Sequence, residues 1–137
     1  MRYDRSNPPD GDRIIRQLTK LVDDNYKQER NAPFYLEKIG LSLSWTNKIT
    51  DYYYGKTLKE LLRDRLVLEA KILLSTTDLS LKAIADELMM RDQATLSVFF
   101  KMMTGERPRM YRVKSKPTEK ATLSVQVLPK PLSFSTN

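Results

Sequence analysis

Apolar residues recur at helical spacing along most of the chain, in segments separated by glycine, proline or candidate capping residues. The pattern predicts helices over residues 13–26, 33–39, 44–54, 58–75, 80–88, 92–103 and 108–112. Thr57 and Glu60 have the spacing of a capping box before the longest helix, and Asp92 is a candidate N-cap. These segments show no convincing strand pattern, so the sequence predicts an all-α fold of about seven helices.

The helical pattern stops near residue 113. Beyond it, Lys-Pro and Leu-Pro steps alternate with serine and threonine, a composition typical of flexible chain. One short strand over residues 123–127 is the only regular element that this stretch suggests. We therefore expect a domain over residues 10–113 and a flexible C-terminal tail over 114–137.

The 137 residues suffice for one domain, or for two very small ones that share an element. The chain has no cysteine and no histidine, which excludes disulfides, thiolate nucleophiles and histidine acid–base chemistry, and removes the preferred zinc ligands. No carboxylate pair or phosphate-binding loop stands out, so we expect neither a cofactor nor an enzyme. No apolar run approaches about 18 residues, and the N-terminus lacks a signal-peptide core, so we expect a cytoplasmic protein.

The net charge of +7 suggests an anionic partner, either nucleic acid or a membrane surface. Two stretches, 33–54 and 80–103, share one plan of a short helix, a tight turn and a second helix. In a DNA-binding helix-turn-helix the second helix enters the major groove. Short helix pairs also occur in bundles, so a helical protein–protein interaction domain with a degenerate helix-turn-helix is the alternative function.

Several motifs, in order, favour the DNA-binding interpretation. They are Leu68–Leu74, Ile84-Ala85, Phe100-Lys101, Thr104-Gly105, Pro108 and Tyr111-Arg112, preceded by Leu41-Ser42, Gly55-Lys56-Thr57 and Arg65. With this spacing, residues 14–112 resemble the C-terminal DNA-binding domain of the AraC/XylS family of bacterial transcription regulators. Residues 57–101 resemble regulators of the Bacteroides type.

The resemblance implies two helix-turn-helix units joined by the long helix over 58–75. About 18 residues at 1.5 Å each span about 27 Å, while successive major grooves on one side of DNA lie about 34 Å apart. One chain is therefore expected to read an asymmetric duplex site in two successive grooves without dimerising. RNA polymerase is a candidate second partner, and no membrane is expected.

The resemblance also implies which residues meet DNA. The base-facing residues are Ser44, Trp45, Asn47, Lys48 and Asp51 in the first unit, and Gln93, Ala94, Ser97 and Val98 in the second. The phosphate-facing residues are Lys56, Arg91 and Lys101. Asparagine and glutamine suit adenine, lysine suits guanine, and the methyl groups of alanine or valine suit the methyl group of thymine.

Two departures from the family pattern change these expectations. Met89-Met90 replaces the usual Gly-Phe, so Met89 would be strained by about 1 kcal/mol if its φ is positive. Val98 stands where the family often has arginine, so we expect the first unit to define the stronger half of the site. Non-DNA roles remain open for Trp45, which would then pack beside a tyrosine, and for Arg65, which would be structural.

Overall fold

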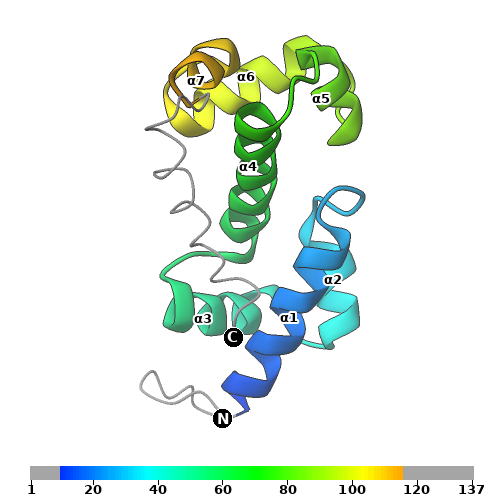
Figure 1. Ribbon diagram of the computed structural model, residues 1–137. Coiled ribbons are helices and arrows are strands. Elements are labelled where there is room, and N and C mark those ends of the chain that lie inside the picture. The colour runs from blue at the N-terminus through cyan, green and yellow to red at the C-terminus, as the bar shows by residue number, and fades with distance from the viewer. Residues whose placement is uncertain (1–9, 116–137) are drawn as a thin grey trace. The chain divides into compact units, whose positions relative to one another are not determined.

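The computed structural model describes residues 10–115, and within that range it contains seven helices and no strand (Figure 1). The helices are α1 (Gly11–Asn25), α2 (Ala32–Ile39), α3 (Leu43–Tyr54), α4 (Leu58–Thr76), α5 (Leu81–Glu87), α6 (Gln93–Thr104) and α7 (Pro108–Ser115). The all-α prediction is confirmed. Helix α7 includes residues 114 and 115, which we had assigned to the tail, because the helical pattern of 108–112 continues for one more turn. The rest of that predicted tail, with its possible strand, lies outside the described residues.

The helix starts follow the capping rules. Thr57 and Glu60 form the predicted capping box: the Thr57 backbone N–H donates to the Glu60 carboxylate over 2.9 Å, and the Glu60 N–H donates to the Thr57 hydroxyl over 3.2 Å. Ser42, Ser80 and Asp92 each accept a backbone N–H bond at the starts of α3, α5 and α6. Local sequence therefore sets where these helices begin.

The turns between paired helices need a left-handed residue. Gly40 ends α2 with φ 78°, a conformation that glycine adopts without strain. After α5 the corresponding residue is Met89, with φ 59°. The sequence predicted strain at Met89 only if its φ is positive, and the structure meets this condition. Met89 therefore carries the strain of a side chain in the left-handed region.

The chain divides into two compact units, and the division falls within α4 between Arg65 and Leu66. In the described part of the first unit, α1 packs against α2 and α3 around a fully buried core. That core includes Leu18, Val22, Tyr35, Ile49 and Leu58. The Arg65 Nε lies 2.9 Å from the Asp23 Oδ1 and its guanidinium stacks 4.3 Å from the Tyr26 ring, so the structural role left open for Arg65 is confirmed.

In the second unit, α6 packs against α5 on one side and α7 on the other (Figure 1). Its fully buried core includes Leu74, Ile84, Leu88, Leu96 and Phe100. Arg112 of α7 donates to three backbone carbonyls, those of Leu74 at 3.0 Å, Thr77 at 3.1 Å and Leu79 at 2.7 Å. One side chain thus holds α7 to the turn between α4 and α5. Among the described helices, none is long and apolar enough to cross a bilayer.

Candidate nucleic-acid interface

The second helix of the first helix-turn-helix, α3, presents an exposed polar stripe. Ser44, Lys48 and Asp51 are exposed and lie three or four residues apart, so they share one face. Trp45 is half-buried, and the Lys48 Nζ lies 5.7 Å from the centre of its indole ring, within cation–π range. Four of the predicted residues therefore lie on or beside one surface of α3.

Asn47, the fifth predicted residue on α3, is half-buried and has an internal partner. Its Oδ1 accepts the backbone N–H of Leu58 over 2.9 Å, which satisfies one of the N–H groups at the start of α4 that lack a helical acceptor. The side chain therefore ties α3 to α4. Contact between Asn47 and a base remains a prediction, and its oxygen would have to serve two donors at once.

Lys56, predicted to contact phosphate, forms an ion pair with Asp64 of α4. The neighbouring carboxylate offsets part of its charge, so the attraction of Lys56 for a phosphate is weaker than that of an unpaired lysine. The sequence pattern alone does not predict this pair, because Lys56 lies before the start of α4 and Asp64 lies within it.

The second helix of the second helix-turn-helix, α6, carries two parallel stripes. Gln93, Ser97 and Lys101 lie four residues apart and form a polar stripe. The next residue in each case forms an apolar stripe. These residues are Ala94, Val98 and Met102. All the base-facing residues predicted for the second unit thus lie on two adjoining strips of one helix.

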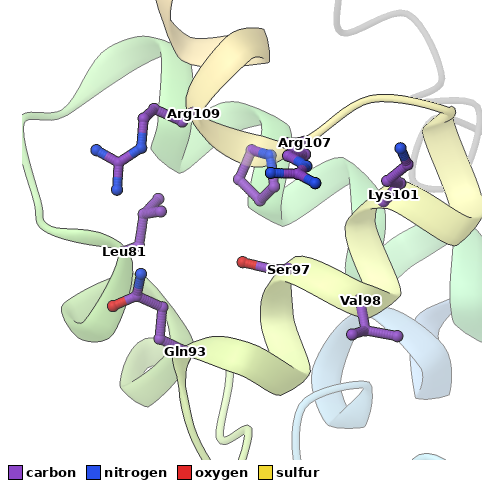
Figure 2. Close-up of a pocket in the computed structure, with 8 residues that line it drawn as sticks. Leu81, Gln93, Ser97, Val98, Lys101, Arg107 and Arg109 are labelled. Atoms are coloured by element: carbon purple, nitrogen blue, oxygen red, sulfur yellow. The ribbon is translucent and has the colours of Figure 1, made fainter.

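The polar stripe lines a pocket of about 330 Å³ between α6, the start of α5 and the start of α7. Figure 2 shows Ser97 pointing into this space, the Gln93 amide directed toward Leu81, and Arg107 and Arg109 on the opposite wall. Val98 points away from its centre (Figure 2). The wall opposite α6 is therefore basic.

Arg107 and Arg109 are site residues that sequence analysis missed. Both are exposed and, with Lys101, place three cations around the pocket, whose described lining contains no carboxylate. Among the described residues, no acidic side chain pairs with any of the three. The available signal was the sequence Arg107-Pro108-Arg109 shortly after the end of α6, from which we used only Pro108, as part of a family motif.

Arg91 lies at the other edge of α6. Its side chain is 82% exposed, and its Nε lies 3.4 Å from the Asp92 Oδ2. Asp92 is the N-cap of α6, and hydrogen bonds from the Thr95 hydroxyl and backbone N–H lower its pKa below the ordinary 3.8. The carboxylate thus stays ionised at neutral pH, and it partly offsets the charge of Arg91.

The apolar stripe lines a second hollow, of about 380 Å³. Its walls are Ala94, Val98, Phe99 and Met102, with Arg91 and Thr95 at the edge. Val98 is 69% and Met102 62% exposed. Val98 also lines the polar pocket, so the two hollows adjoin along α6. Across residues 10–115, no group of three or more acidic side chains is placed to hold a metal ion.

Comparison with known proteins identifies the family of this chain. A family model described as a helix-turn-helix domain matches residues 35–114, more than half of the chain. The chain therefore belongs to this family of helix-turn-helix domains, of the AraC type, which are DNA-binding domains of transcription regulators. No curated protein matches it significantly.

Three solved structures share the fold. The C-terminal domain of AraT, a response regulator from Geobacillus stearothermophilus, has a TM-score of 0.67 and 23% identity, with 77% of this chain and 88% of that chain covered. The DNA-binding domain of the transcriptional factor AdpA, in complex with a target DNA, has a TM-score of 0.63 and 19% identity, with 73% of this chain and 90% of that chain covered. A probable AraC family transcriptional regulator from Rhodopseudomonas palustris has a TM-score of 0.60 and 18% identity, with 77% of this chain and 99% of that chain covered.

Proposed function

We propose that this chain binds a specific double-stranded DNA sequence by inserting α3 and α6 into successive major grooves. The observation that carries the proposal is the basic pocket beside α6. There, Gln93 and Ser97 share a hollow with three cations. Polar side chains on a helix surface can read base edges, while flanking arginine and lysine bind the phosphates that border the groove.

Each group in the pocket has a chemically suited target. Gln93 can pair with the N6 and N7 atoms of adenine. The guanidinium groups of Arg107 and Arg109 suit the oxygens of a phosphodiester, because two parallel N–H groups can meet two oxygens. Lys101 adds a point charge. We assign these three cations to phosphate, and Arg91 to a weaker contact because Asp92 is its neighbour.

On α3, we assign base contact first to Lys48, which is exposed and can donate to the O6 and N7 atoms of guanine. Ser44 and Asp51 flank it on the same face, and Trp45 borders it. We also retain the predicted contacts of Asn47 with adenine and of Lys56 with phosphate. Both are expected to be weaker, because Asn47 already binds the Leu58 N–H and Lys56 pairs with Asp64. The first half of the site should therefore contain guanine.

The two units share α4, whose 19 residues correspond to about 28 Å of helix. A single chain with two reading helices does not need a partner copy, so we propose a monomer that binds an asymmetric site as a binding module and not as an enzyme. Transcription regulation makes RNA polymerase the expected second partner, and chromosomal DNA implies action in the cytoplasm. Origin from a regulator of the Bacteroides type is also part of the proposal, on the sequence of residues 57–101 alone.

The first test is selection of bound sequences from a random duplex pool, followed by affinity measurements over a range of salt concentrations. About 6 phosphate contacts would make log K fall with log[salt] at a slope near −5. Arg107→Ala and Lys101→Ala should each make that slope shallower by about 0.9. The matched control is Lys82→Ala, because Lys82 is 76% exposed and pairs with Asp86 on α5, outside both hollows. No duplex binding at low salt would contradict the proposal.

A further inference from the structure

We propose that the apolar hollow on α6 reads the C5-methyl groups of thymine in the half-site bound by the second unit. This inference rests on the proposed function and specifies the base chemistry that α6 recognises. The reading groups are the side chains of Ala94 and Val98, with Met102 closing the end of the hollow.

The apolar stripe is a continuous surface and not a set of scattered residues. Ala94, Val98 and Met102 follow one another at intervals of four, and all three are exposed on one strip of α6. Single exposed apolar residues need no explanation, but a shared hollow of about 380 Å³ with apolar walls indicates a contact surface. Phe99, which is half-buried, also lines it.

The position of this hollow argues for DNA as the occupant. Val98 lines both the apolar hollow and the basic pocket, so a duplex held by the cations of that pocket would continue across Val98 onto the apolar stripe. Arg91 at the edge of the hollow adds a further cation. An anionic polymer fits a surface with basic side chains on both sides of an apolar strip, and a typical protein surface does not.

Thymine is the base that suits this strip. In the major groove it presents a methyl group, whereas guanine and cytosine present only acceptors or donors. Polar edges placed against Val98 would lose their water without gaining a hydrogen bond, which is unfavourable. The strip therefore favours thymine and disfavours guanine and cytosine, while Gln93 on the neighbouring stripe can read adenine.

The test removes the methyl group from the DNA. Selection from a random duplex pool should return a half-site with thymine at fixed positions, one helical turn from the guanine-containing half. Replacing those thymines with deoxyuridine leaves base pairing unchanged and deletes only the methyl. We expect affinity to fall by about fourfold for each methyl that contacts the protein, the effect of one buried carbon.

Protein variants then assign the effect to the hollow. Val98→Ala should weaken binding to the thymine duplex and reduce the difference between thymine and deoxyuridine. Val113→Ala is the matched control, because Val113 is 68% exposed on α7 and lines neither hollow. Both valines are too exposed for their truncation to unfold the domain.

The outcomes separate this inference from the proposed function. If the protein binds no duplex, both fail. If it binds a selected duplex with the expected salt dependence but tolerates deoxyuridine, or selects no fixed thymine in the second half, the thymine inference alone is overturned. Unchanged DNA binding by Val98→Ala would overturn it too.

Discussion

The two helix-turn-helix units follow one plan but use their second helices differently. On α3 the polar side chain of Asn47 binds the start of α4, and Lys48 lies against the Trp45 ring. On α6 the side chains of Gln93 and Ser97 face the space of the basic pocket (Figure 2). In the first helix-turn-helix, a polar side chain of the second helix therefore supports the fold. In the second, the polar side chains of the second helix line a surface pocket.

The support of the second unit comes from elsewhere. Arg112 of α7 binds three carbonyls around the α4–α5 turn, so α6 does not need to supply that link itself. The difference teaches that a reading helix can remain exposed when a neighbouring helix holds the unit together. The expectation from the sequence that the first unit dominates base readout stays a prediction. The exposed side chains of Gln93 and Lys101 beside Arg107 and Arg109 make α6 a second candidate for that role.

Of the substitutions proposed here, removal of the Arg112 side chain should cause the largest loss of stability, and this loss should be confined mainly to the second unit. Arg112→Met leaves three carbonyls without a charged donor, and we expect a loss of about 2–4 kcal/mol in the free energy of unfolding. Urea denaturation gives the total loss. Hydrogen exchange should show faster opening in α5 and α7 than in α1 and α2.

Arg109→Met on the same helix is the control, because Arg109 is exposed and we assign it to phosphate. It should leave stability nearly unchanged and weaken DNA binding. Equal destabilisation by the two variants would mean that the three carbonyl bonds do not hold the second unit together.

The structure separates what the sequence can predict from what it cannot. The Thr57–Glu60 box and Asp92 act within four residues of the groups that they cap, so local rules predicted them. The family pattern singled out the position of Met89 but left open the sign of its φ, which is positive in the structure. These are short-range properties of the chain, and they account for most of the fold.

The partners of Asn47 and Arg112 could not be predicted in this way. Asn47 and Leu58 lie 11 residues apart, and Arg112 lies 33 to 38 residues from its carbonyl partners. The sequence likewise shows the charges of Arg107 and Arg109 but not that the α6–α7 turn places them beside Gln93. Tertiary packing decides which polar groups remain available to a ligand.

Substitution of Asn47 should sharpen the contrast between α3 and α6. Asn47→Ala leaves the Leu58 N–H without its acceptor, and we expect a loss of about 1 kcal/mol in stability. Asn47→Asp keeps an acceptor and should retain stability, but it loses the amide donor that adenine N7 needs. Urea denaturation measures the first effect, and position-by-position DNA binding the second. If Asn47→Asp leaves base preference unchanged, the predicted contact with adenine is wrong and the residue is structural only.

The turns of the two units should respond to substitution with opposite signs. Gly40→Ala places a side chain at φ 78°, where an added Cβ meets no atom within 4 Å, so the expected loss of about 1 kcal/mol comes from the backbone alone. Met89→Gly relieves the strain at φ 59° and should gain up to about 1 kcal/mol, less the extra chain entropy of glycine. Urea denaturation of both variants checks the signs. A loss of stability in Met89→Gly would show that contacts of the methionine side chain outweigh the strain.

The smallest expected effect distinguishes the caps of the two reading helices. Ser42, which caps α3, is neutral, whereas Asp92, which caps α6, has a pKa lowered by hydrogen bonds from Thr95. A carboxyl group with a lowered folded-state pKa contributes stability that is fully present above its ordinary pKa, here 3.8, and is lost as the pH falls below that value through the folded pKa.

We therefore expect α6 to loosen before α3 in acid. Asp92→Asn keeps a capping oxygen that does not titrate. The stability of this variant should therefore fall less steeply than that of the wild type between pH 4 and pH 2, a range of about two units that begins near the ordinary aspartate pKa and extends below it. Denaturation across this range compares the two proteins, and identical curves would mean that the Asp92 cap does not contribute to the acid sensitivity of the second unit.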